Sequence, residues 1–181
     1  MVIEPEIEEP ARRMLGCAVR GELDQLAALM TELAPERFLQ CLGLYVRVSG
    51  YIAIDVSGPG WPTDAHQRRL AQLMAGVDLD FSLEEPDVYA FLSRSALGFE
   101  PVFDVFPDKE RAAIVPVLTT AALLASYRTG GQHWWDYLDI IERSFEQAAS
   151  LPQEAFPAVL LWTQSNRAPK SRQAGDGTAG A

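Results

Sequence analysis

The chain has 181 residues, of which 48% are hydrophobic and 22% charged, and its formal net charge is −10. This length and balance predict one globular domain with a real core, not a disordered chain. The negative charge argues against a nucleic-acid binder, which needs a basic face, and against docking on an anionic membrane. It suits a basic protein partner, although an acidic surface also serves simply to keep a protein soluble.

The two ends of the chain are predicted to lie outside the folded domain. Residues 1–9 hold four glutamates and lack the basic and apolar regions of a secretory signal, so we expect a flexible acidic lead. Residues 165–181 contain no aliphatic side chain larger than alanine, which predicts a disordered tail. The helical domain is therefore expected to span residues 10–164, with its first helix starting at Pro10.

The two cysteines, Cys17 and Cys41, both lie among apolar residues and belong to no CxxC or Cys/His pattern. This setting predicts two buried free thiols in a reducing, cytoplasmic compartment. A single disulfide between them is the alternative.

The first half of the chain holds one clear helix and one ambiguous stretch. Residues 22–33 carry apolar side chains at helical spacing, namely Leu23, Leu26, Ala27, Met30 and Leu33. Residues 38–56 hold only two charges and fit a buried helix that begins at Pro35. Their second half alternates β-branched residues around Ser49-Gly50, which also fits a β-hairpin over 44–56. The helical surroundings favour the helix.

Residues 57–63 form a predicted loop rich in glycine and proline, which includes Trp61. A helix over residues 64–76 is expected to turn Leu70, Leu73 and Met74 inward. Another follows a capping box at Ser82 and is expected to bury Val88, Phe91 and Leu92.

Residues 108–127 are the stretch around which we expect the fold to be organised. No charge occurs between Arg111 and Arg128, and a helix that is apolar on every side must be surrounded by other elements. It is short for a membrane span and is interrupted by Pro116. We expect Asp108 to cap it and Pro116 either to kink one helix or to start a second.

The last predicted helices are one over residues 133–149, with an apolar stripe opposite a charged side, and one after Ser150 that is divided by Pro157. The elements pair as 22–33 with 35–56, 64–76 with 83–97, and 108–128 with 133–149. Such helical hairpins are typical of repeat arrays, but no constant period or consensus occurs. The sequence therefore predicts an all-α, compact, irregular multi-helix bundle.

No catalytic motif is present, and we expect no cofactor. Phosphate-binding glycine loops are missing, and the only adjacent arginines are the pairs at 12–13 and 68–69. His133, Asp136, Asp139 and Glu142 recur every third residue, as metal ligands sometimes do, but this spacing drifts around a helix. A solvated face, with an Asp139–Arg143 pair, is the favoured interpretation. A metal site built from His66 and His133 is a weaker alternative.

The tryptophans are the remaining candidates for function. If Trp134 is buried, Trp135 points about 100° away and is partly exposed beside Asp136 and Asp139. Aromatic residues beside acids are plausible protein-recognition hot spots, and Trp61 extends the same idea to the loop. The alternative is that Trp135 covers the edge of the core.

We therefore expect a non-enzymatic, cytoplasmic protein-interaction module, such as an adaptor, regulator or inhibitor, that is a monomer or a homodimer. An enzyme or ligand-binding bundle that uses His66, His133 and nearby carboxylates is the second hypothesis.

Overall fold

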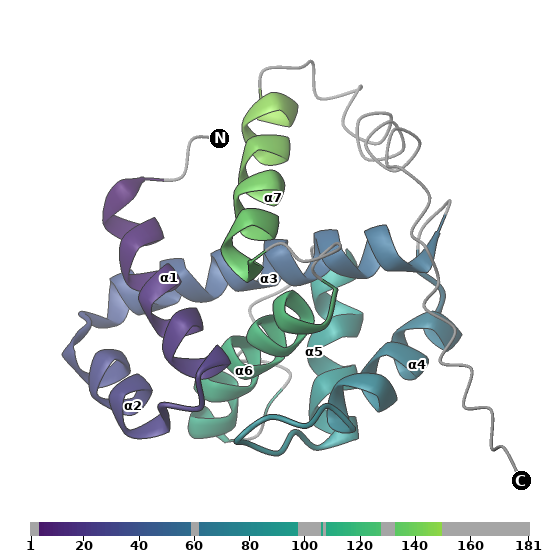
Figure 1. Cartoon of the computed structure of the whole chain (residues 1–181), viewed down its shortest axis with the longest axis horizontal. Coiled ribbons are helices and arrows are strands. Elements are labelled where there is room, and N and C mark those ends of the chain that lie inside the picture. Colours follow the sequence, from purple (N-terminus) through teal and green to yellow (C-terminus); the bar gives the residue numbers. More distant parts are fainter. Residues whose placement is uncertain (1–3, 59–61, 98–105, 107, 128–132, 150–181) are drawn as a thin grey trace, which may run out of the picture.

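The computed structural model describes residues 4–58, 62–97, 106, 108–127 and 133–149, and Figure 1 shows how their helices are arranged. These residues form seven α-helices and contain no strand, so the predicted all-α multi-helix bundle is confirmed. The helices are α1 (Pro5–Val19), α2 (Leu23–Glu32), α3 (Pro35–Ser57), α4 (Asp64–Ala75), α5 (Glu85–Leu97), α6 (Lys109–Tyr127) and α7 (Trp134–Ala149).

Two long helices, α3 and α6, share the centre of the bundle (Figure 1). Helix α6 was expected to be surrounded, and its residues from Val115 to Leu124 are all buried. Helix α3 is buried to a similar extent and packs against α1, α4, α5, α6 and α7. The two are joined by a hydroxyl pair, because Ser49 Oγ lies 2.8 Å from Thr120 Oγ1 in a site with no access to solvent.

Helix α6 continues through Pro116 as one element. Pro116 has no backbone N–H to donate, yet its carbonyl accepts a 2.6 Å hydrogen bond from Thr120 Oγ1. The predicted cap at Asp108 is confirmed, since its carboxylate accepts a 2.9 Å hydrogen bond from the backbone of Glu110.

The hairpin alternative for residues 44–56 is wrong, because α3 runs through them without a break. Ser49 and Gly50, which resemble a turn in the sequence, lie buried in the middle of the helix. Tyr45, Val48 and Ile52 are fully buried at helical spacing. Packing against other helices therefore outweighs the strand propensity of the β-branched residues.

The first helix begins at Pro5 and not at Pro10, so residues 5–9 of the expected flexible acidic lead are helical. Pro5 occupies a first-turn position, where its missing N–H costs nothing, and Pro10 lies inside the helix. The helix ends at Val19, and Gly21 follows two residues later with a φ of 71°. This conformation allows Glu22 N to donate to Cys17 O at 2.9 Å and Gly21 N to donate to Ala18 O at 3.1 Å. These two hydrogen bonds together form a Schellman motif, which a glycine adopts without strain.

The helices do not form a repeat array. Repeat units contact only their neighbours along the chain, whereas α1 packs against α6 and α3 against α5 and α6. Of the expected hairpins, α4 and α5 pack closely side by side, while the main partners of α3 lie later in the chain.

Several smaller expectations were wrong or remain open. Leu73 is 51% exposed and not part of the core, and the helix after Ser82 begins at Glu85. Leu70, Met74, Val88, Phe91 and Leu92 are buried as predicted. The predicted tail at 165–181 and the helix after Ser150 lie outside the described residues.

Among the described helices, α3 alone is long and apolar enough to cross a membrane by length and composition. Its most apolar 18-residue stretch is 56% buried inside the bundle. The core helix of a soluble protein can have the same length and composition.

Candidate functional site

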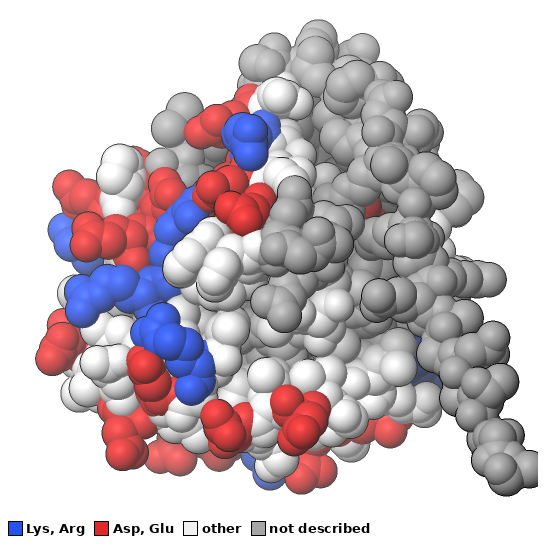
Figure 2. All heavy atoms as spheres, in the orientation of Figure 1, with Lys and Arg blue, Asp and Glu red and all other residues white. Residues whose placement is uncertain are grey.

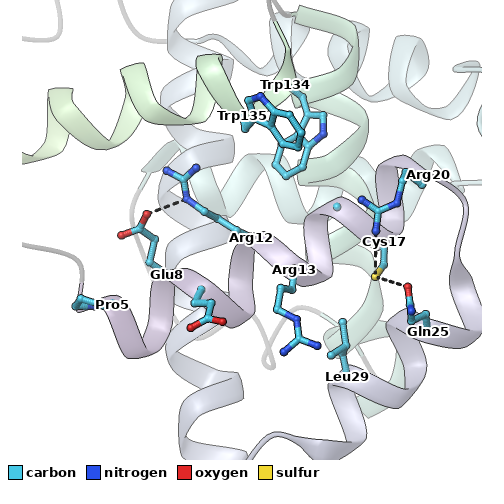
Figure 3. Close-up of a pocket in the computed structure, with 12 residues that line it drawn as sticks. Pro5, Glu8, Arg12, Arg13, Cys17, Arg20, Gln25, Leu29, Trp134 and Trp135 are labelled. Carbon is cyan, nitrogen blue, oxygen red and sulfur yellow. Dashed lines mark hydrogen bonds and ion pairs between the residues drawn. The ribbon is translucent and has the colours of Figure 1, made fainter.

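A groove of about 720 Å³ runs along the outer face of α1 and is open to solvent (Figure 3). Its floor is α1, and its two walls are the start of α7 and one side of α2. Figure 2 shows basic side chains gathered over α1, within a surface that is otherwise mostly acidic or uncharged. The lining residues are Pro5, Glu8, Glu9, Arg12, Arg13, Gly16, Cys17, Arg20, Gln25, Leu29, Trp134 and Trp135.

The floor residues recur every three to four positions from Pro5 to Arg20, which is the spacing of one face of a helix. Gly16 lies in the middle of this face. A methyl group there would come within 3.6 Å of the Trp134 ring and 3.1 Å of the Arg20 guanidinium. The distance to Trp134 is an ordinary van der Waals contact, so it is the Arg20 guanidinium that a side chain at this position would crowd.

Arg12 contacts three carboxylates, one on its own helix and two on α7, and so ties α1 to α7. Its guanidinium lies 2.8 Å from Glu8 and 2.5 Å from Asp139, and it also donates to Glu142. Burial opposes the charge on Arg12, but the carboxylates outweigh it and raise its pKa. Three acids around one base leave this cluster with an excess of negative charge.

Glu142 is the buried member of the cluster, with 8% of its surface exposed. Its Oε1 atom is buried and has no hydrogen-bond partner among the described residues. Burial raises the pKa of Glu142 to about 7, even though Arg12 acts in the opposite direction. Glu142 therefore changes its protonation state near neutral pH.

The solvated-face interpretation of His133, Asp136, Asp139 and Glu142 is therefore wrong for Glu142. The expected Asp139–Arg143 pair also takes another form, because Arg143 Nε donates to the backbone carbonyl of Asp139 at 3.1 Å. The Asp139 carboxylate accepts from Arg12 instead. No group of three or more possible metal ligands occurs in the described part of the chain.

The other two arginines of the groove differ in how they are held. Arg20 binds Glu22 through two hydrogen bonds, of 2.9 and 2.7 Å. Arg13 is exposed and makes no hydrogen bond or ion pair with any described residue. Figure 3 shows the Arg13 side chain pointing towards Leu29, on the opposite side of α1 from the two tryptophans.

Trp135 is 44% exposed at the rim of the groove, whereas Trp134 is 5% exposed. The His133 ring stacks on Trp135 with centroids 4.1 Å apart, and the Trp134 ring lies 5.5 Å away at a tilt. The Asp136 carboxylate accepts a 2.8 Å hydrogen bond from the backbone of His133, so it caps α7. The exposed position expected for Trp135 is thus found, and Trp135 lines the same groove as three arginines of α1. Trp61 lies outside the described residues.

Cys17 and Cys41 are free and buried, as the sequence predicts. Cys17 lies in the floor of the groove, where its Sγ is 3.4 Å from Gln25 Oε1. Burial raises the pKa of both thiols, that of Cys41 to about 11. Both are therefore protonated at neutral pH and are poor nucleophiles.

His66 and His133 have separate local roles. His66 is part of a capping box, in which its backbone N donates to Thr63 Oγ1 at 3.3 Å and its Nδ1 accepts from Thr63 N at 3.4 Å. Both histidines are exposed, and neither is among the groove's described lining residues.

The sequence missed the arginines of α1, because Arg12 and its partners Asp139 and Glu142 are about 130 residues apart in the chain. The sequence does contain one indication that Glu142 is not an ordinary surface residue. Glu142 is four residues after Leu138 and three before Phe145, so a helix places it at the edge of the apolar stripe.

No family model, curated protein or solved structure matches this chain.

Proposed function

We propose that the protein is a non-enzymatic interaction module that binds another protein through the α1 groove, with Trp135 as its anchor. The observation that carries the proposal is an exposed tryptophan at the rim of an open groove whose floor holds three arginines. Tryptophan and arginine are the residue types most enriched among interface hot spots.

The chemistry of the groove favours binding over catalysis. Its one thiol, Cys17, is buried and carries a raised pKa, and none of its described lining residues is a histidine. Arg12 forms ion pairs with Glu8 and with Asp139 of α7, so neither Arg12 nor Glu8 is a free charged group. These features support recognition by shape, aromatic contact and charge. We place the module in the cytoplasm, because two free cysteines suit a reducing compartment.

The test is native mass spectrometry of the protein purified from its own cells, as wild type and as two variants. Trp135→Ala removes the proposed anchor, and we expect it to lower the occupancy of a bound protein at least tenfold. Leu73→Ala is the matched control, because Leu73 is an equally exposed apolar residue on α4, outside the groove. We expect this variant to retain the partner.

Other outcomes would overturn the proposal. A small molecule or metal in place of a protein would favour the ligand-binding hypothesis, and His66 and His133 would then be substituted next. A partner that both variants retain would place the interface elsewhere. A chain that carries nothing in its own cells would contradict a stable interaction through this groove. Thermal unfolding of each variant shows whether the fold is preserved.

A further inference from the structure

The groove has the length of a peptide-binding site. Its floor extends from Pro5 to Arg20, which corresponds to about 22 Å along a helix that rises about 1.5 Å per residue. An extended segment of about seven residues, at roughly 3.3 Å per residue, would fill that length. A compact small molecule would contact only part of it.

The charges are distributed unevenly along this floor. Glu8 and Glu9 lie near its N-terminal end, Arg12 and Arg13 near its middle, and Arg20 at its C-terminal end. Arg12 is already neutralised by the carboxylates that join α1 to α7. The cations that face a ligand are therefore Arg13, which makes no ion pair with a described residue, and Arg20. Arg20 also pairs with a carboxylate, that of Glu22, but its side chain is 52% exposed, whereas that of Arg12 is 27% exposed and is surrounded by three carboxylates.

We infer that the groove binds an acidic segment of the partner protein, whose carboxylates contact Arg13 and Arg20 while an apolar or aromatic side chain packs on Trp135. A guanidinium pairs with a carboxylate through two parallel hydrogen bonds, which gives both strength and orientation. The inference rests on the proposed function and specifies its ligand. It differs from the basic partner that the net charge of −10 favours, because the lining of the groove holds three arginines against two glutamates.

The geometry also predicts the spacing within the ligand. Arg13 and Arg20 are seven residues apart, or about 10 Å along the helix axis. In an extended segment this distance separates residues about three positions apart. Acidic residues are excluded from the end of the ligand that lies beside Glu9, because like charges repel there.

The experiment is selection of a random heptapeptide display library on the full-length protein at moderate salt. We expect the selected peptides to be enriched in Asp and Glu, two of them about three positions apart, together with an aromatic or large aliphatic residue. Selection on Arg13→Glu should lose this acidic enrichment. Selection on Arg69→Glu should keep it, because that substitution changes the net charge equally at an exposed arginine of α4, outside the groove.

A synthetic copy of the best peptide then gives the size of the effect by fluorescence anisotropy. We expect Arg13→Glu to weaken its binding at least tenfold and Arg69→Glu to change it less than twofold. Arg13→Gln, which leaves no repulsive charge, should weaken it by an intermediate factor.

Enrichment in Lys and Arg would overturn the inference in favour of a basic ligand, and equal effects of the two charge reversals would show that net charge alone matters. A library from which nothing is selected would also overturn it. None of these results would remove the proposed function if Trp135→Ala still releases a partner protein in the native spectrum. If Trp135→Ala did not release the partner, both the proposed function and this inference would be overturned.

Discussion

Helices α3 and α6 meet at the centre of the bundle through neutral side chains, whereas α1 and α7 meet at its edge through charged side chains, of which Glu142 is buried. At the centre, the polar contact between the two helices is the Ser49–Thr120 hydroxyl pair, surrounded by fully buried aliphatic residues. At the edge, one guanidinium faces three carboxylates, and a carboxylate oxygen of Glu142 has no described partner. The first contact does not depend on pH near neutrality, but the second does.

This difference bears on the proposed function, because α1 and α7 also form the floor and a wall of the groove. The element that carries Trp134 and Trp135 is attached to α1 partly through ionisable groups. A buried charge cluster adds little net stability when complete and costs much when one member is removed. The groove is therefore built beside a contact whose strength depends on the charge of Glu142.

The largest effect is expected at the centre. Leu123 of α6 is fully buried, and Leu123→Ala should lower the free energy of unfolding by about 4 kcal/mol, through lost burial and the cavity left behind. Urea denaturation at pH 5 and at pH 8 measures this loss, and we expect the same value at both. A loss that changes by more than about 1 kcal/mol between the two pH values, a margin close to that of such extrapolations, would contradict a neutral centre.

At the edge, we expect Arg12→Met to lower the free energy of unfolding by about 3 kcal/mol at pH 8, because it leaves the Glu142 carboxylate buried without its counter-ion. At pH 5 the loss should be smaller, since Glu142 is then mostly protonated and neutral. The same denaturation series measures both values. Arg13→Met is the matched control, because the neighbouring Arg13 is exposed and has no described partner.

A loss from Arg12→Met that is equal at the two pH values would show that Arg12 acts by packing alone. Combining Arg12→Met with Glu142→Gln separates the two roles further. If the charges interact, the double variant should be more stable at pH 8 than the sum of the single effects predicts.

The same two regions show what the sequence could and could not predict. The burial of α6 follows from an uncharged run between Arg111 and Arg128, and the inner faces of α4 and α5 follow from helical spacing. These are local patterns, and the structure confirms them except at Leu73, which is exposed. The sequence leaves two alternatives for residues 44–56, because strand propensity favours a hairpin whereas the helical surroundings favour a helix. The packing of α3 against its neighbours, which the sequence does not show, decides for the helix.

The groove depends on contacts that no local pattern contains. Trp135 was identified from its position beside Trp134, but its arginine neighbours come from the other end of the chain. Arg12 looks like an ordinary surface residue in a charged helix, and the place of Glu142 at the edge of an apolar stripe does not say which residue it contacts. Their contact results from the way α7 lies on α1, which depends on the whole bundle.

The smallest effect expected in this comparison is that of Glu142→Gln, which keeps the shape of the side chain and removes its charge. Because the pKa of Glu142 is raised from 4.5 to about 7 in the folded protein, the folded state binds the proton more tightly than the unfolded state. The contribution of Glu142 to stability is therefore fully present below about pH 4.5 and falls as the pH rises to about 7.

Relative to wild type, we expect Glu142→Gln to be more stabilising at pH 8 than at pH 5 by about 2 kcal/mol, since the variant has no charge to bury. Urea denaturation of both proteins across this range measures the difference, and Glu146→Gln serves as the control because Glu146 is an exposed residue of the same helix. A difference that does not change with pH would mean that Glu142 is ionised at no cost in the folded state. In that case the edge of the bundle would be as insensitive to pH as its centre, and the contrast between the two regions would lie in their polarity alone.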